Sequence, residues 1–161
     1  MLQLPMENVH PLVVHFPIAL LLTALFLDGL ALALKRPGIH RAALWNLCFG
    51  TMGAAAAVLT GLQAAQIAKH SFAIHQVMGL HEKLGIATLI LGLLVLGWRL
   101  FRRDRLPTRA RLVTLIVMLA MAGTLSYGAH LGGRLVYEFG VGGVYGRSAS
   151  GIEVVNPDHH R

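Results

Sequence analysis

Four long apolar runs divide the chain. The runs cover residues 11–34, 42–68, 81–98 and 112–133. A helix of about 20 apolar residues crosses the hydrocarbon core of a bilayer. The second and fourth runs contain no charged residue, and the first contains only Asp28. The pattern therefore predicts four membrane-spanning helices.

We expect an all-α membrane protein, an antiparallel four-helix transmembrane bundle that forms one integral membrane domain of residues 1–161. The predicted helices cover about residues 11–35, 41–69, 77–102 and 109–133. A short glycine-rich extracytoplasmic segment, 134–161, follows them. Its residues 135–139 have strand character, which predicts a small lid or hairpin over the outer end of the bundle.

Composition supports this class of protein. The chain is 55% hydrophobic and only 13% charged, and its mean hydropathy is +0.63, which is too apolar for an ordinary soluble domain. Only Glu7 is charged before the first run, whereas a cleavable signal peptide has a basic start. The first helix is therefore expected to stay attached. The single cysteine, Cys48, leaves no intramolecular disulfide and no covalent haem-attachment motif.

Basic residues collect at one end of the predicted bundle, and they set its orientation. Nine of them lie there: Lys35, Arg36, Arg41, Arg99, Arg102, Arg103, Arg105, Arg109 and Arg111. Loops rich in Lys and Arg stay in the cytoplasm, so both termini are expected on the outer side. The formal charge of +7 then reflects topology and contact with the lipid bilayer, and it indicates no nucleic-acid partner.

Three predicted helices carry a histidine at one depth. At 1.5 Å per residue, His15, His81 and His130 each lie roughly 27 to 30 Å from the basic end of their helix. Histidines inside a membrane usually face the bundle interior, so we expect these three to line one site near the outer interface. Small residues around Gly61 of the second helix lie at the same level. Three further histidines on that side are secondary candidates: His10, His70 and His75.

Asp28 is the second candidate for a functional group. We expect Asn46 and Thr51 of the second helix at a similar depth, as hydrogen-bond partners. An intramembrane carboxyl marks a functional site by default, here a proton relay or a quinone contact. A purely structural, hydrogen-bonded carboxyl is the alternative, and the sequence leaves both open.

Three motifs identify a family. The stretches HPLVVHFPIALL, HEKLG and GAHLGGRLVYEFGVG resemble those of a bacterial family of four-helix membrane proteins, the domain-of-unknown-function family twenty-two thirty-one. The resemblance spans nearly the whole chain and implies the same fold and a bacterial inner (plasma) membrane location. Together with the orientation given by the basic residues, it predicts a multi-pass protein with both termini periplasmic. It implies no activity. The positions that match the family's motifs are His10, His15, His81, His130, Gly132, Gly133 and Tyr137.

The first hypothesis for the histidines is a haem b for electron transfer between the quinone pool and a periplasmic redox protein. Two histidines on different helices can serve as axial ligands, and His15, His81 and His130 are the candidates for the two positions. Arg134, one turn beyond His130, is expected to reach a propionate, and Tyr127, one turn before it, to hydrogen-bond a ligand.

Two alternatives remain open. A zinc or copper ion held by His15, His81 and His130 would keep an open fourth position, with Glu82 as a supporting hydrogen-bond partner. A cofactor-free accessory subunit of a homo- or hetero-oligomeric membrane complex would use the same histidines for hydrogen bonds between helices. No nucleophile is paired with a base and an acid, so an electron carrier or accessory subunit is expected rather than a stand-alone enzyme.

Overall fold

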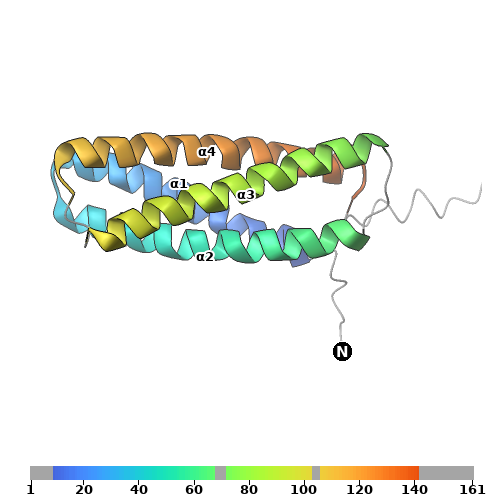
Figure 1. The fold of residues 1–161 in the computed structure, drawn as a ribbon, viewed down its shortest axis with the longest axis horizontal. Helices are drawn as coiled ribbons and strands as arrows, with labels where there is room; N and C mark the ends of the chain where they lie inside the picture. The colour runs from blue at the N-terminus through green and yellow to red at the C-terminus, as the bar shows by residue number, and fades with distance from the viewer. Residues whose placement is uncertain (1–8, 68–71, 103–105, 142–161) are drawn as a thin grey trace, which may run out of the picture.

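The computed structural model describes residues 9–67, 72–102 and 106–141, and it forms a bundle of four long helices (Figure 1). The helices are α1 (Val9–Leu34), α2 (Pro37–Ile67), α3 (Phe72–Phe101) and α4 (Thr108–Tyr137). All four are long and apolar enough to cross a membrane. The predicted four-helix architecture is confirmed.

Backbone conformation and hydrogen bonds at the loops explain where the helices begin and end. Lys35 adopts φ 54° after α1, and the Arg36 amide donates to the Ala31 carbonyl at 3.2 Å, which closes the helix. Pro37 then opens α2, a position where a missing N–H costs nothing. Extended backbone at Pro107, with φ −64° and ψ 157°, starts α4. The turn between the first two helices is therefore tight, and α2 begins earlier than predicted.

The end of α4 corrects one expectation. The segment predicted to have strand character continues the helix through Tyr137, and Leu135 packs inside the bundle. Arg134 and Glu138 form an i,i+4 ion pair on this last turn, at 2.9 Å, which favours helix. Gly140, at φ 66°, then turns the chain. Of the predicted C-terminal segment 134–161, residues 142–161 lie outside the described residues.

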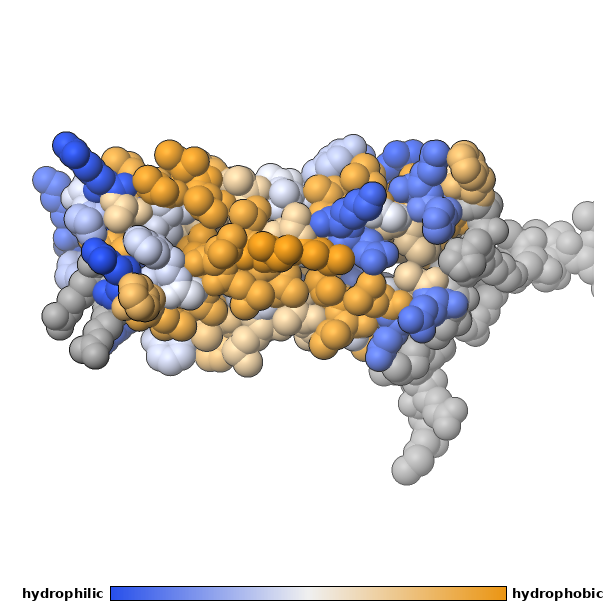
Figure 2. All heavy atoms as spheres, in the orientation of Figure 1, coloured by the Kyte–Doolittle hydropathy of each residue, from blue (hydrophilic) through white to orange (hydrophobic). Residues whose placement is uncertain are grey.

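Each helix has two neighbours in the bundle. α1 and α3 both pack against α2 and α4, so α1 and α3 face each other across a diagonal. The core between them is apolar and includes Leu21, Leu47, Val95, Met118 and Met121. Large apolar side chains also cover the outside, where Figure 2 shows them as a band across the middle of the visible face, with hydrophilic residues towards both ends. This distribution suits a molecule whose sides contact lipid.

The two helix hairpins repeat one pattern of buried positions. Asp28 of α1 and Arg99 of α3 lie 71 residues apart, and the same spacing relates other buried residues of the two hairpins. These pairs include Pro17 and Thr88, Leu21 and Gly92, Ala24 and Val95, Ala43 and Thr114, and Leu47 and Met118. The hairpins α1–α2 and α3–α4 therefore share one register of buried positions, and we call them the two repeats.

Candidate functional site

Two histidines meet across the diagonal at one end of the bundle. His10 lies in the first turn of α1, and His81 lies on α3. Their ring centroids are 6.1 Å apart, with an interplanar angle of 83°. The two residues are 71 positions apart in the chain, so they are equivalent positions of the two repeats. The structure thus brings together one histidine from each repeat.

Hydrogen bonds fix the tautomer of both rings. His81 Nδ1 lies 2.8 Å from the Gly128 carbonyl, which only accepts, so Nδ1 carries the proton. His10 Nδ1 lies 3.2 Å from the Thr60 hydroxyl oxygen, whose own proton is donated to the Ala56 carbonyl at 2.9 Å. The Thr60 oxygen therefore accepts from His10. In the neutral form of each imidazole, Nε2 is then the nitrogen without a proton, and it is the atom that can bind a metal.

Each imidazole ring packs against a glycine of a neighbouring helix. A Cβ added at Gly61 of α2 would lie 3.0 Å from Cε1 of His10, and one added at Gly132 of α4 would lie 3.1 Å from Cε1 of His81. These two glycines are themselves equivalent positions of the repeats. Each histidine is thus held by the next helix of its own hairpin, through an oxygen acceptor and a glycine surface.

The other predicted histidines lie apart from this pair. His15 is exposed, and its Nδ1 donates to the Pro11 carbonyl of its own helix at 2.6 Å. His130 is exposed and stacks on Tyr127, with ring centroids 6.3 Å apart. Arg134 donates to Glu138 at 2.9 and 3.0 Å. Of the three histidines that the sequence ranked first, only His81 takes part in the pair.

Glu82, His75 and His70 are the remaining candidates from the sequence. Glu82 and His75 are exposed on α3, and His70 lies outside the described residues. Within residues 9–67, 72–102 and 106–141, no three His, Cys, Asp or Glu side chains are grouped as metal ligands. A metal at this site would therefore take two ligands from the described part of the chain.

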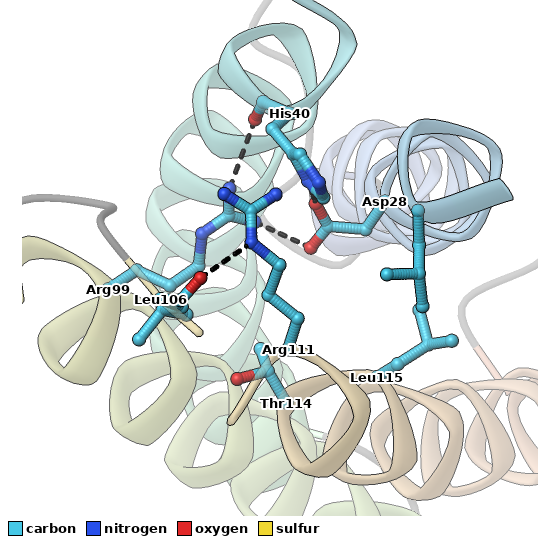
Figure 3. A pocket seen from close by; sticks show the side chains of 8 residues that line it. Asp28, His40, Arg99, Leu106, Arg111, Thr114 and Leu115 are labelled. Atoms are coloured by element: carbon cyan, nitrogen blue, oxygen red, sulfur yellow. Dashed lines mark hydrogen bonds and ion pairs between the residues drawn. The ribbon is translucent and has the colours of Figure 1, made fainter. Parts of the chain in front are cut away.

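A second polar cluster lies at the opposite end of the bundle (Figure 3). Asp28 accepts from His40 Nδ1 at 2.9 Å through one carboxylate oxygen and from Arg99 Nη1 at 2.6 Å through the other. Arg99 also donates from Nη2 to the His40 carbonyl at 3.0 Å. The side chains of Asp28 and Arg99 are only 8% and 2% exposed. The three residues lock α1, α2 and α3 together.

This cluster corrects the partners expected for Asp28. Asn46 donates to the Ala42 carbonyl at 2.9 Å, and Thr51 donates to the Leu47 carbonyl at 2.7 Å, so both serve their own helix. Arg99, which the sequence analysis counted among the nine basic residues at one end, is the buried counter-ion of Asp28. A buried carboxylate needs a charged partner because desolvation costs several kcal/mol per ion.

The architecture and hydropathy define a four-span membrane protein with an internal histidine pair at one end and an internal ion-pair cluster at the other. The chain belongs to the family described as "Predicted membrane protein (DUF2231)", whose model matches residues 6–144. No curated protein and no solved structure matches it.

Proposed function

We propose that this protein is a membrane redox protein that binds one haem b between His10 and His81 and transfers electrons between the quinone pool and a partner outside the membrane. The observation that carries the proposal is the pair itself: two imidazoles from diagonal helices, each with Nδ1 protonated and Nε2 available. Bundles bind cofactors in this way, with side chains from facing helices.

The spacing of the rings fits two axial ligands. Imidazoles bonded to opposite sides of one metal, with bonds of about 2 Å, have ring centres roughly 6 Å apart. The observed separation is 6.1 Å. Both ring planes of such a pair contain the metal–nitrogen axis, so they can adopt any mutual angle, including the observed 83°. Haem bound here would be held by the Nε2 atoms of His10 and His81.

Small residues on α2 and α4, the other diagonal pair of helices, favour the binding of a flat group such as haem. The surfaces beside the histidine pair belong to α2 and α4. These helices present Ala57 and Gly61 on one side and Gly128 and Gly132 on the other, again equivalent positions of the two repeats. Backbone without a large side chain lets a planar group approach closely. Haem bound there would supply one-electron chemistry, while the chain supplies ligands and an apolar surrounding.

The number of ligands favours haem over a single metal ion. A porphyrin brings four nitrogen ligands of its own and needs only two from the protein. Zinc sites use three or four protein ligands, and the described residues offer two at this point. A zinc or copper ion remains the second candidate because the same pair of Nε2 atoms would ligate it.

The proposed location is the bacterial inner membrane, with both termini periplasmic. The exposed basic residues Lys35, Arg36, Arg41, Arg102 and Arg109 lie at the end of the bundle opposite the histidine pair. The positive-inside rule assigns that end to the cytoplasm. The histidine pair would then lie near the periplasmic surface, within reach of a soluble redox protein.

A reduced-minus-oxidised absorbance spectrum of the protein, purified in detergent after expression with ample haem, tests the proposal. We expect sharp b-type bands that are lost in His10→Ala and His81→Ala. His15→Ala and His130→Ala are the matched controls and should keep them, since these side chains are exposed. His81→Met should retain haem and raise its midpoint potential, because a thioether axial ligand does so.

The other outcomes separate the alternatives. Loss of haem in His15→Ala or His130→Ala, with binding intact in His10→Ala, would refute the assignment of the axial pair. A colourless protein that contains stoichiometric zinc or copper, with His159 and His160 replaced to prevent adventitious binding, would favour the metal site. A protein with neither would be a cofactor-free accessory subunit.

A further inference from the structure

An apolar groove of about 350 Å³ runs along the outside of the bundle between α1 and α4. Phe26, Gly29 and Ala33 line it on α1, and Leu115 and Leu119 line it on α4. α1 and α4 are the most loosely packed of the neighbouring helix pairs. The nearest atom to a Cβ built on Gly29 is Leu115 Cδ1, at 4.0 Å. The groove is open here because Gly29, which has no side chain, faces Leu115. A larger residue at position 29 would fill the space.

The groove adjoins the pocket of the ion-pair cluster. Leu115 lines both, and Arg111, one turn earlier on α4, lines the pocket together with Asp28, Arg99 and His40. Figure 3 shows the Arg111 guanidinium directed towards the side of the pocket where His40 and Arg99 lie. The Arg111 guanidinium and the apolar groove thus lie next to each other along α4.

Arg111 has donors that remain available. Its Nε donates to the Leu106 carbonyl at 2.9 Å, which fixes the side chain. Both oxygens of Asp28 are taken by His40 and Arg99. Every buried side-chain nitrogen and oxygen of the described residues has a partner, so any N–H group of Arg111 that has no partner among these residues lies at the surface.

We propose that Arg111 and the groove form a binding site for an anionic phospholipid, with the phosphate at the guanidinium and one acyl chain between α1 and α4. Guanidinium groups bind phosphate through paired N–H donors. From Ala33 to Leu25 the groove extends for roughly 12 Å, the length of several methylene groups. Basic pockets between transmembrane helices at the cytoplasmic side bind anionic headgroups, and exposed basic residues surround this end.

Native mass spectrometry of the delipidated protein tests this, with phosphatidylglycerol and phosphatidylcholine of identical chains as probes. We expect tighter binding of phosphatidylglycerol, and we expect Arg111→Gln to weaken it about fivefold, the effect of one cationic side chain on an anionic lipid. Arg109→Gln is the matched control because Arg109 is exposed on the same helix. Arg111→Lys should retain part of the preference.

A second substitution tests the groove independently of charge. Gly29→Leu should weaken both lipids by filling the channel, whereas Gly97→Leu should not, since Gly97 faces open space on α3. Equal binding of the two lipids, or an unchanged preference in Arg111→Gln, would overturn the proposal. Full competition by inorganic phosphate would indicate a site for a free oxyanion, and unchanged affinity in Gly29→Leu would exclude the groove.

Discussion

The Arg99 guanidinium lies 2.6 Å from the Asp28 carboxylate, and this ion pair joins the diagonal helices α1 and α3 inside the bundle. The residues occupy equivalent positions of the two repeats, just as His10 and His81 do at the other end. The bundle is thus connected across its diagonal twice, once by opposite charges and once by two imidazoles. The two connections have different consequences for stability and function.

Removal of one charge of the buried pair should destabilise the fold strongly. Asp28→Asn leaves the Arg99 guanidinium without its carboxylate in an apolar environment, and we expect a loss of about 3 to 5 kcal/mol in the free energy of unfolding. Denaturant unfolding in detergent micelles measures it. The double variant Asp28→Leu, Arg99→Met should recover most of the loss. A single-variant loss below about 1 kcal/mol, the value of an exposed pair, would show that the cluster is wet rather than buried.

Glycine should be required on α2 and α4 beside the histidine rings. Gly132→Ala places a methyl group 3.1 Å from the His81 ring, and we expect a cost of about 1 to 3 kcal/mol together with weaker haem binding. Gly133→Ala is the control, since nothing lies within 4 Å of its added Cβ. Thermal unfolding and haem absorbance of the two variants report the difference. Equal thermal stability and equal haem absorbance of both variants would contradict the packing of His81 against Gly132.

In the proposed haem site, the Thr60 hydroxyl should strengthen haem binding through its hydrogen bond with His10 of α1. Thr60→Val removes the acceptor of the His10 Nδ1 proton, and loss of such a supporting hydrogen bond typically lowers metal affinity 10- to 100-fold. Haem titration of the apoprotein measures the change. Thr114→Val serves as the control because Thr114 donates to the Ala110 carbonyl of its own helix. Similar losses in the two variants would assign the effect to general helix packing.

Glu138 should titrate below its ordinary pKa of 4.5. The hydrogen bonds from Arg134, and then its positive charge, favour the carboxylate and lower the pKa of Glu138. The ion pair therefore stabilises the last turn of α4 fully above pH 4.5 and loses its effect as pH falls through the lowered value. Infrared titration of the carboxylate should show this shift and its disappearance in Arg134→Gln. An unshifted titration in the parent protein would exclude the pair in solution.

The histidine pair depends on helix rotation, which a depth estimate based on counting residues does not include. Depth estimates placed His15 level with His81, but residues five apart on a helix point about 140° away from each other. His10 therefore faces the bundle interior, and His15 faces outwards. The 71-residue spacing that relates His10 to His81 and Gly61 to Gly132 is a signal in the sequence that agrees with the pair seen in the structure.

The sequence alone determined the class of protein and the number of its helices. Apolar runs that are long enough to cross a bilayer have few other solutions, because every backbone polar group must be satisfied within the helix. The continuation of α4 to Tyr137 escaped this reasoning, since a glycine-rich stretch lowers helix propensity and packing of Leu135 restores it.

Only the tertiary structure decided which polar residues meet. Asp28 selected Arg99 and His40 rather than Asn46 and Thr51, and His81 met His10 rather than His15 or His130. Helix rotation and the diagonal arrangement of α1 and α3 determine these partners. Both depend on how apolar side chains of all four helices pack, so no single helix contains the information.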